Sequence, residues 1–499
     1  MKFIVAAFSA ALCLFATVNS VVAQDVTLTS RDKSIEISGN LLGFDGTYYR
    51  VDTVYGELTV DGTGVLCEGP ACPNLEAYIA ELTFSGTPII GRVLLPALIE
   101  GYARGAGLSV RRTEFGGALT TYELFSEHDL ETIGVFTIKQ TSNDEGFADI
   151  LSNEADVAMA LRAASDEEIA FAVEAGYGAL NSGAQHEVIA MDALVPTVDR
   201  DSGVTSISMT HLAGLLDGSV TRWRELGEDS DALIQVVLTD SVGDVFQPVA
   251  TVMQKNGFAN PSIPNVHVLE SSPLSLDLAF YSSVPSTRRA IPISDRCGIA
   301  HASEARAIKA LEYPLSLPMY LYRPMRRMPK IGQDFFNYLD GTSAKRVVER
   351  AGFQAIDASE ADVDTQGRRL ANAISLASAA DLLGLKEAVN ELKGRRLLSL
   401  VFRFDDDGDG YDANSSTSMK RLVRLAESGG LDGQSLLFVG FGIDEGLAEK
   451  VAMDFQTEFP AGPGVIEIST AEFGEVMPVA CPDTELGKHK NTRVEVWVR

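Results

Sequence analysis

Hydrophobic and polar residues alternate over short stretches in the first folded part of the chain. Between residues 24 and 79, runs of Val, Ile, Thr and Tyr are separated by Gly, Asp and Asn. Alternation with a period of two is typical of strands that bury one face, and the separating residues are typical of turns. The pattern predicts a small β module over residues 24–79.

From residue 80 to residue 355 the pattern changes to longer units. Continuous hydrophobic runs, such as residues 187–198 and 234–240, are separated by segments with helical spacing, such as residues 208–227 and 330–353. Strands that alternate with helices form parallel sheets whose two faces are both covered. This region is therefore predicted to be an α/β domain.

A turn of small residues follows the first strand of this α/β region. The strand pattern ends at Phe84, Ser85, Gly86 and Thr87 follow, and Pro88 stands where a first helical residue is tolerated. The first backbone N–H groups of a helix have no partner within the helix, and the helix dipole is positive at that end. Such a turn is a candidate for holding an anion.

The last part of the chain shows two further patterns. Residues 356–395 are charged and rich in Ala and Leu, which predicts a helical connector. Residues 396–499 alternate again between strand-like and helix-like segments, which predicts a second α/β domain.

The N-terminus has the pattern of a secretory signal peptide. Lys2 precedes an apolar run, and small residues lead to an expected cleavage after Ala23. No later apolar run reaches the roughly 18 residues that a membrane-spanning helix needs. We expect residues 1–23 to be removed and the mature protein to be soluble in the periplasm.

Four cysteines remain after this cleavage. Cys67 and Cys72 flank a loop that contains Gly and Pro, and in an oxidising compartment this spacing predicts a local disulfide. Cys297 and Cys481 are predicted to be either free or paired with each other across domains.

The net charge of −28 over 499 residues restricts the partners of the protein. So strong an acidic balance argues against nucleic acid or an anionic membrane as a partner. It does not exclude a small anion, because a helix terminus and a single Arg control the field inside a cleft while distant charges are screened.

Four segments in the 80–355 region resemble PstS-type periplasmic phosphate-binding proteins. Residues 84–91, FSGTPIIG, resemble the first anion-binding loop of that family, and residues 141–168 resemble its second loop and the strand that follows. Residues 206–227, where a helix runs into a Gly turn and then Trp, and residues 313–353 are similar to later segments in the same order. The resemblance implies a two-lobed periplasmic binding protein fold of type 2, without a cofactor or an enzymatic activity, that delivers its ligand to an ABC-transporter permease.

The resemblance also implies a site for phosphate or a similar oxyanion between the two lobes. The residues expected there are Ser85, Gly86, Thr87, Ser142, Arg162 and Ser241. Hydroxyl groups and a guanidinium are suitable donors to a tetrahedral oxyanion. The alternative for Thr87 and Ser142 is ordinary helix capping.

Two positions depart from the family pattern. The third loop reads TDSVGDVF, in which Ser241 and Gly243 remain as donors but Asp244 places a negative charge near any anion, unless it points away. Leu161 and Arg162 stand where the family has an Asp that accepts the proton of hydrogen phosphate. Sulfate, molybdate, phosphonate and organic anions therefore remain open as ligands.

The C-terminal hundred residues resemble the OmpA-like peptidoglycan-binding domain. Asn491 and Arg493 belong to the strand motif Asn-x-Arg-Val-Glu of that family, and Asp444 matches the Asp that binds the wall peptide. Leu447 stands where the family has its second ligand, an Arg, and Lys450 lacks the forked geometry of a guanidinium. Peptidoglycan is the partner that this resemblance implies.

Weaker signals do not change this interpretation. Asp405, Asp407 and Asp409 start like a calcium loop, but Ser416 occupies the twelfth position, so an acidic turn is favoured. The six His residues are scattered and form no metal-binding pair, so no metal is expected. The alternative to an oxyanion receptor is a cell-envelope scaffold that keeps the fold, leaves the cleft empty and attaches to peptidoglycan.

Overall fold

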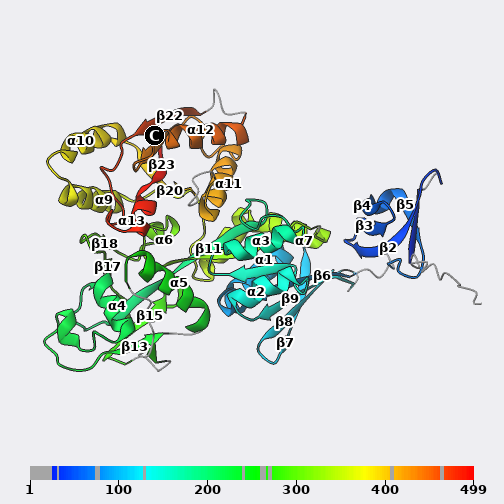
Figure 1. Cartoon of the computed structure of the whole chain (residues 1–499), viewed down its shortest axis with the longest axis horizontal. Coiled ribbons are helices and arrows are strands. Elements are labelled where there is room, and N and C mark those ends of the chain that lie inside the picture. Colours follow the sequence, from blue (N-terminus) through cyan, green and yellow to red (C-terminus); the bar gives the residue numbers. More distant parts are fainter. Residues whose placement is uncertain are drawn as a thin grey trace, which may run out of the picture. The chain divides into compact units, whose positions relative to one another are not determined.

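The computed structural model describes residues 25–30, 33–73, 79–126, 128, 131–238, 242–258, 266–267, 272–326, 328–404, 410–460 and 466–499. The chain forms two compact units, Met1–Tyr78 and Ile79–Arg499 (Figure 1). The expected signal peptide lies outside the described residues. In the described part of the chain, no helix has both the length and the apolar character needed to cross a bilayer.

The first unit is an antiparallel sheet in the order β4-β3-β2-β1-β5. Val26, Leu28, Tyr49 and Val51 form its buried centre. Cys67 and Cys72 form a disulfide with their Cα atoms 5.8 Å apart. The predictions of a small β module and of a local disulfide are confirmed. The strands are β1 (Val26–Ser30), β2 (Glu36–Phe44), β3 (Tyr48–Thr53), β4 (Gly56–Asp61) and β5 (Val65–Glu68).

The second unit contains an 11-stranded sheet whose main path is β14-β13-β15-β11-β19-β10-β6-β9-β8-β7, with β16 paired to β11. A short sheet, β12-β17-β18, lies apart from it. The strands of the large sheet are β6 (Ala80–Gly86), β7 (Leu108–Phe115), β8 (Leu119–Ser126), β9 (Thr132–Gln140), β10 (Val157–Ala160), β11 (His186–Asp199), β13 (Gln235–Leu238), β14 (Val266–His267), β15 (Ser275–Phe280), β16 (Arg288–Ala290) and β19 (Ser316–Tyr322). Those of the short sheet are β12 (Ile207–Ser208), β17 (Ile293–Ser294) and β18 (Ala300–His301).

Strand β11 joins two groups of strands. Its residues from His186 to Ala193 pair with β19, and its residues from Leu194 to Thr197 pair with β15. All of its residues except Asp199 are buried, as the continuous hydrophobic run predicted. We call residues 79–185 together with 323–353 the first lobe and residues 200–315 the second lobe.

Helices cover the sheet in both lobes. In the first lobe they are the π-helical turn η2 (Ile90–Leu94), α1 (Leu95–Gly105), α2 (Asn143–Leu151), α3 (Asp166–Glu174), α7 (Lys330–Leu339) and α8 (Thr342–Arg350). In the second lobe they are α4 (Met209–Asp217), α5 (Val242–Lys255), α6 (Ala305–Lys309) and the 3₁₀ turns η3 (Trp223–Leu226) and η4 (Tyr281–Ser283). Gly218 ends α4 with φ 82°, a left-handed conformation that glycine adopts without strain.

Two expectations for this region are corrected. The sheet is mixed rather than parallel, because β7, β8 and β9 pair antiparallel while β6 runs parallel to β9 and β10. The first strand does not end at Phe84 but continues through Gly86, so that Ser85 and Gly86 belong to β6. Backbone pairing with β9 and β10 on both sides holds these two residues extended, which the turn-like composition did not indicate.

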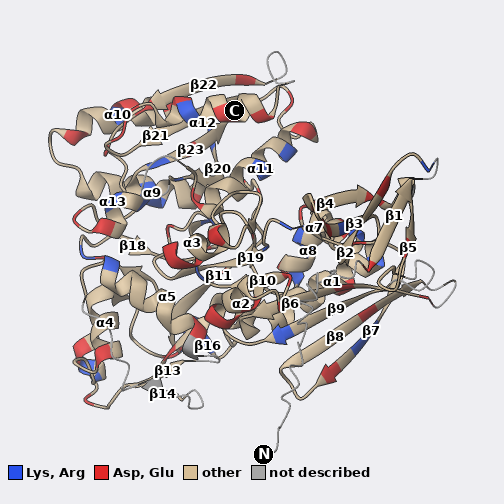
Figure 2. Cartoon of the chain, turned by 45° about the vertical axis from the view of Figure 1, so that its right-hand side comes forward, with Lys and Arg blue, Asp and Glu red and all other residues tan. Residues whose placement is uncertain are grey.

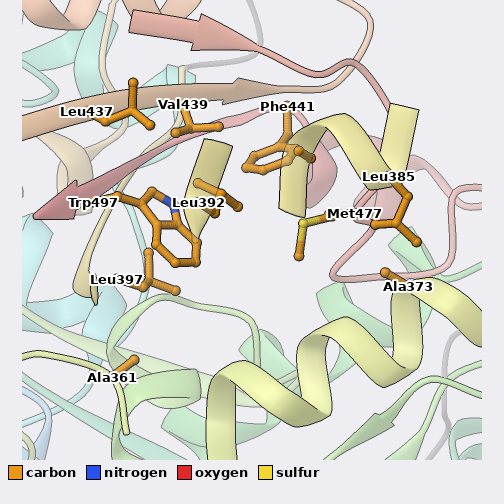
Figure 3. Close-up of a cluster of buried hydrophobic side chains, with 11 residues drawn as sticks. Ala361, Ala373, Leu385, Leu392, Leu397, Leu437, Val439, Phe441, Met477 and Trp497 are labelled. Carbon is orange, nitrogen blue, oxygen red and sulfur yellow. The ribbon is translucent and has the colours of Figure 1, made fainter. Parts of the chain in front are cut away.

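The C-terminal residues form a four-stranded sheet in the order β20-β23-β21-β22. Alternate residues of β21, namely Leu437, Val439 and Phe441, pack with Trp497 against α9 and α10 (Figure 3). The two helices predicted as a connector thus lie on one face of this sheet. Its elements are α9 (Val363–Leu376), α10 (Asp381–Leu392), β20 (Arg396–Phe402), α11 (Ala413–Glu427), β21 (Ser435–Phe441), α12 (Leu447–Glu458), β22 (Glu467–Glu472), α13 (Glu485–Asn491) and β23 (Arg493–Val498).

This C-terminal part contacts the first lobe through α11. Arg421, which is 4% exposed, lies 3.2 Å from the carboxylate of Asp340 and 3.6 Å from that of Glu187. Arg424 also pairs with Asp340, and Lys420 donates a hydrogen bond of 2.7 Å to the carbonyl oxygen of Gly183.

The same part also contacts the second lobe. Cys481 forms a disulfide with Cys297, and its N–H donates a hydrogen bond of 2.8 Å to Asp295. The guanidinium of Arg403 donates a hydrogen bond of 2.8 Å to the carbonyl oxygen of Ala310. The pairing of Cys297 with Cys481, which the sequence left open, joins residues separated by 184 positions. The C-terminal part therefore bridges both lobes.

Candidate functional site between the lobes

The end of strand β6 lies against the backbone of β10. Gly86 has φ 139°, and a Cβ atom at this position would stand 2.0 Å from the carbonyl oxygen of Met159. Only glycine permits so close an approach with this backbone conformation. Ser85 and Thr87 are fully buried on either side of Gly86.

The two hydroxyl groups beside Gly86 already have partners within the first lobe. The Ser85 hydroxyl lies 3.2 Å from that of Thr141. The Thr87 hydroxyl accepts a long hydrogen bond of 3.4 Å from the N–H of Ile89, and the Thr87 N–H donates to the Met159 carbonyl oxygen at 3.0 Å. The helix that follows begins at Pro88 with a regular hydrogen bond of 3.2 Å from the Gly91 N–H to the Thr87 carbonyl oxygen, and the π-helical turn η2 comes after it.

Helix α2 begins directly beside Ser85 and Gly86. A Cβ atom on Gly146, in its first turn, would stand 2.8 Å from the Ser85 carbonyl oxygen. Ser142 is the N-cap of α2, and its hydroxyl accepts a hydrogen bond of 3.1 Å from the Glu145 N–H. The structure thus brings Ser85, Gly86 and Ser142 together, and gives Ser142 the capping contact weighed as the alternative to ligand binding.

The first N–H group of α2 points at a carboxylate of the second lobe. The Asn143 N–H donates a hydrogen bond of 2.9 Å to Oδ1 of Asp244, in the first turn of α5. The Asn143 side-chain amide donates 3.0 Å to the Asp244 carbonyl oxygen, and its Oδ1 accepts 2.9 Å from the Leu161 N–H. Asn143 and Asp244 are 2% and 8% exposed. The carboxylate of Asp244 therefore occupies the N-terminus of α2, where an anion would bind.

Arg162 lies close to the same helix terminus but is engaged by acidic side chains. It forms a forked pair with Glu168 at 2.8 and 2.7 Å and contacts Asp144 at 2.6 Å. Its guanidinium carbon stands 4.7 Å from the centre of the Phe147 ring. The hydrogen bonds that Arg162 donates to Glu168 and Asp144 raise its pKa, although burial opposes them. Figure 2 shows the acidic first turns of α2 and α3 that supply these partners.

Of the predicted oxyanion residues, Ser241 lies outside the described residues. Sequence reasoning missed Asn143, whose side chain joins both lobes. The sequence predicted Asp244 as an adverse charge near any anion unless it points away, and in the structure its carboxylate, from α5, accepts the first N–H of α2. The signal for the pair was present in the sequence, because an Asn after an N-cap and an Asp in a first helical turn are both able to bind backbone donors.

The predicted wall-binding residues occupy two separate places. Asp444 is exposed and lines an open pocket together with Glu445, Glu449 and Glu472. Glu472 accepts a hydrogen bond of 2.9 Å from the Ala448 N–H at the start of α12, and burial raises the pKa of Glu472.

Asn491 and Arg493 are buried in the body of the C-terminal part. The Asn491 side chain accepts hydrogen bonds of 2.8 and 3.0 Å from the N–H groups of Val479 and Ala480. Arg493 is fully buried, 2.8 Å from Glu495 and 4.4 Å from the centre of the Phe441 ring. Neither residue lines the pocket at Asp444. A role for these three residues in peptidoglycan binding stays a prediction.

Candidate metal ligands are sparse among the described residues. Cys297, Cys481 and Asp483 form a group close enough to hold an ion, but the two cysteine sulfurs are bonded to each other. The Asp residues of the possible calcium loop, Asp405, Asp407 and Asp409, lie outside the described residues.

A family model matches the central part of this site. Residues 112–247 match the model of the PBP superfamily domain. This PBP superfamily region is about a quarter of the chain, and it contains both Asn143 and Asp244. No curated protein matches the chain.

Three solved structures are similar in fold to about half of the chain. An ABC-type phosphate transport receptor from Vibrio cholerae is 18% identical with a TM-score of 0.40, and covers 55% of this chain and 98% of its own. PstS from Borrelia burgdorferi is 14% identical with a TM-score of 0.39, and covers 55% and 98%. A phosphate-binding protein from Stenotrophomonas maltophilia is 12% identical with a TM-score of 0.37, and covers 55% and 90%. At these identities and TM-scores, the ligand of this chain is inferred from the geometry of its own site.

Proposed function

We propose that this protein is an exported solute-binding protein that takes phosphate or a similar oxyanion at the N-terminus of α2, in place of the Asp244 carboxylate. The observation that carries the proposal is the hydrogen bond of 2.9 Å between the Asn143 N–H and Asp244 Oδ1. A backbone donor at a helix N-terminus, buried between two lobes, is suited to a negatively charged oxygen.

In this proposal, the ligand competes with a group of the protein itself. Phosphate and the Asp244 carboxylate are both negative, so the two do not occupy the α2 terminus together. A ligand that displaces Asp244 also breaks the hydrogen bonds between Asn143 and the second lobe. Binding is thereby coupled to a movement of α5 relative to α2, and an ABC-transporter permease is the proposed recipient of the ligand.

Isothermal titration calorimetry of the full-length protein tests this function. The protein is first unfolded and refolded to remove any bound ion, and then titrated with phosphate, sulfate and molybdate. Asp244→Ala removes the internal competitor, so we expect its affinity for the preferred anion to be at least tenfold higher than that of the wild type. Asp364→Ala, an exposed Asp in the first turn of α9, is the matched control and should bind as the wild type does.

The outcomes separate the parts of the proposal. Absence of saturable heat with all three anions, in both the wild type and Asp244→Ala shown to be folded, overturns the receptor function. Equal affinity of the two proteins for the same anion leaves the receptor function standing and contradicts the competition by Asp244.

A second candidate function is that of a cell-envelope scaffold attached to peptidoglycan. The observation that favours it is the bridge formed by the C-terminal part, which pairs Arg421 with Asp340 of the first lobe and Cys481 with Cys297 of the second. Lobes that are both held by a third body are restrained from the opening that a transport receptor requires.

Sedimentation of the full-length protein with insoluble peptidoglycan tests the scaffold function. Asp444→Ala should reduce the bound fraction, because Asp444 is exposed and matches the Asp with which OmpA-like domains bind the wall peptide. Glu427→Ala, at the end of α11, is an acidic control outside the Asp444 pocket. Equal sedimentation of all proteins with and without peptidoglycan would exclude wall attachment.

A further inference from the structure

A cavity of about 190 Å³ lies where three parts of the second unit meet. Its walls come from α6 and the neighbouring loops of the second lobe, from α9, and from the loop that precedes α13. It is separate from the site between the lobes, since it is lined by none of the residues described there. The apolar side is formed by Pro292, Ile299, Ala300, Met477 and Val479.

The polar side of the cavity is formed by two arginines that belong to a buried chain of ion pairs. Arg306, 8% exposed, pairs with Glu312 at 2.6 and 2.9 Å. Arg369 lies 3.5 Å from Glu312 and also pairs with Glu495, which in turn lies 2.8 Å from Arg493. This series of buried ion pairs thus contains three guanidinium groups, of Arg306, Arg369 and Arg493, and two carboxylates, of Glu312 and Glu495.

The two carboxylates of these ion pairs stay ionised, so the three guanidinium groups exceed them by one positive charge. Burial by itself would raise the pKa of Glu312 and of Glu495, but the guanidinium groups around them hold both well below the usual range. The other acids at this junction have partners of their own, because Glu304 pairs with Arg368 and Asp295 lies 3.5 Å from His301. Buried charge without a counter-charge is costly, which favours an added anion.

The two arginines at the cavity also have unused hydrogen-bond donors. The Nε atoms of Arg306 and Arg369 are buried, and neither has a hydrogen-bond partner among the residues that the structure describes. Almost all buried polar groups in proteins are hydrogen-bonded, so two orphaned donors beside one cavity indicate that something completes the site. Water is the simplest occupant, but water supplies no negative charge.

We propose that this cavity binds a small monocarboxylate with a compact apolar body. The carboxylate of the ligand balances the one excess positive charge of the buried ion pairs. Forked pairing with arginine is a strong mode of carboxylate recognition. The apolar body lies against the wall formed by Ile299, Met477 and Val479. An engineered cavity of about 150 Å³ holds a benzene molecule, so this cavity has room for a carboxylic acid of similar size.

The position of the cavity gives the ligand a structural consequence. Its walls belong to the second lobe and to the C-terminal part, which includes α9, so an occupant contacts both at once. A ligand that binds only the assembled junction stabilises the assembly by mass action.

Calorimetry and thermal unfolding of the full-length protein with sodium benzoate, sodium butyrate and benzamide test the proposal. Asn372 lines the cavity from α9, and Asn372→Phe adds an aromatic ring to its wall while every residue of the ion pairs is retained. Ala371→Phe, at the exposed neighbouring position, is the matched control. We expect saturable binding of benzoate or butyrate, at least tenfold weaker in Asn372→Phe and unchanged in Ala371→Phe, with no comparable binding of benzamide.

The remaining outcomes contradict the proposal. Absence of saturable binding of both carboxylates at millimolar concentration, in folded wild-type protein, shows that the cavity holds water only. Equal binding by Asn372→Phe and the wild type places the ligand elsewhere, and equal binding of benzamide and benzoate shows that the charge is not recognised. Saturating phosphate should leave benzoate binding unchanged, because the two sites are separate.

Discussion

The carboxylate of Asp244 lies 2.9 Å from the backbone nitrogen of Asn143, and these residues come from different lobes. Their separation in the chain is 101 positions. The pair fills the terminus of α2 with a negative oxygen supplied by the protein. The two lobes are thus joined by a hydrogen bond that resembles the contact of an anion with a helix terminus.

Replacement of Asn143 should destabilise the protein. Asn143→Ala removes the hydrogen bond that the side chain donates to the Asp244 carbonyl oxygen and the one that it accepts from the Leu161 N–H. The Leu161 N–H is then left without this acceptor. We expect a loss of about 2–4 kcal/mol in the free energy of unfolding. Urea unfolding followed by circular dichroism measures it, with Asn181→Ala at an exposed position as the control. A loss equal to that of the control would mean that these contacts contribute nothing.

Arg162 should not be replaceable by Lys. Its fork binds both oxygens of Glu168 and reaches Asp144, and the pair with Glu168 is largely buried, with 17% and 16% of the side chains exposed. A lysine ammonium cannot reproduce this geometry. We expect Arg162→Lys to lower stability by about 1–3 kcal/mol. Arg112→Lys, which affects an exposed pair with Glu114, should change stability by less than about 0.5 kcal/mol. Similar urea midpoints for the two variants would show that the fork is dispensable.

The two disulfides should differ in their effect on stability. Cys297–Cys481 closes a loop across 184 positions, whereas Cys67–Cys72 closes one across 5. Constraint of the unfolded chain grows with loop length, so we expect the double variant Cys297→Ser/Cys481→Ser to lose about 2–5 kcal/mol from the second unit. Cys67→Ser/Cys72→Ser should lose less, and only from the first unit. Peptide mapping without reductant checks both pairings, and recovery of free Cys297 and Cys481 from the native protein would contradict the bridge to the second lobe.

Glu187 should make stability depend on pH. Burial, followed by the charge of Asp340, raises the pKa of Glu187 to about 7, while Arg421 opposes the shift. In the unfolded chain this carboxyl ionises near its ordinary pKa of about 4.3. Between these two values the folded state retains a proton that the unfolded state has lost, so stability falls as the pH rises through this window.

Urea unfolding at pH 4.5 and pH 7.5 measures this dependence. The wild type should lose stability on the order of 3 kcal/mol more than Glu187→Gln does over the same interval. Glu174→Gln, at an exposed position, should retain the wild-type slope. Parallel slopes for the wild type and Glu187→Gln would show that Glu187 is ionised in the folded protein throughout.

Much of the architecture could be predicted from the sequence because it depends on neighbours in the chain. The hydrophobic run of β11, the Gly218 end of α4, the Ser142 cap of α2 and the Cys67–Cys72 disulfide all follow from local spacing. The error at Ser85 and Gly86 arose because small residues indicate a turn, whereas pairing with strands on both sides keeps them extended. Local propensity is a weak preference that tertiary pairing overrides.

The sequence by itself determined the α/β class of the central region, the small β module and the acidic character of the protein. Only the tertiary structure decided which distant residues meet: Asp244 with Asn143, Arg162 with Glu168, Arg421 with Asp340, and Cys297 with Cys481. The reason is that periodicity and capping act over a few residues, whereas the partner of a buried charge depends on how whole elements pack. The groups near the α2 terminus were therefore recognisable in the sequence, but their occupation by the protein's own carboxylate was not.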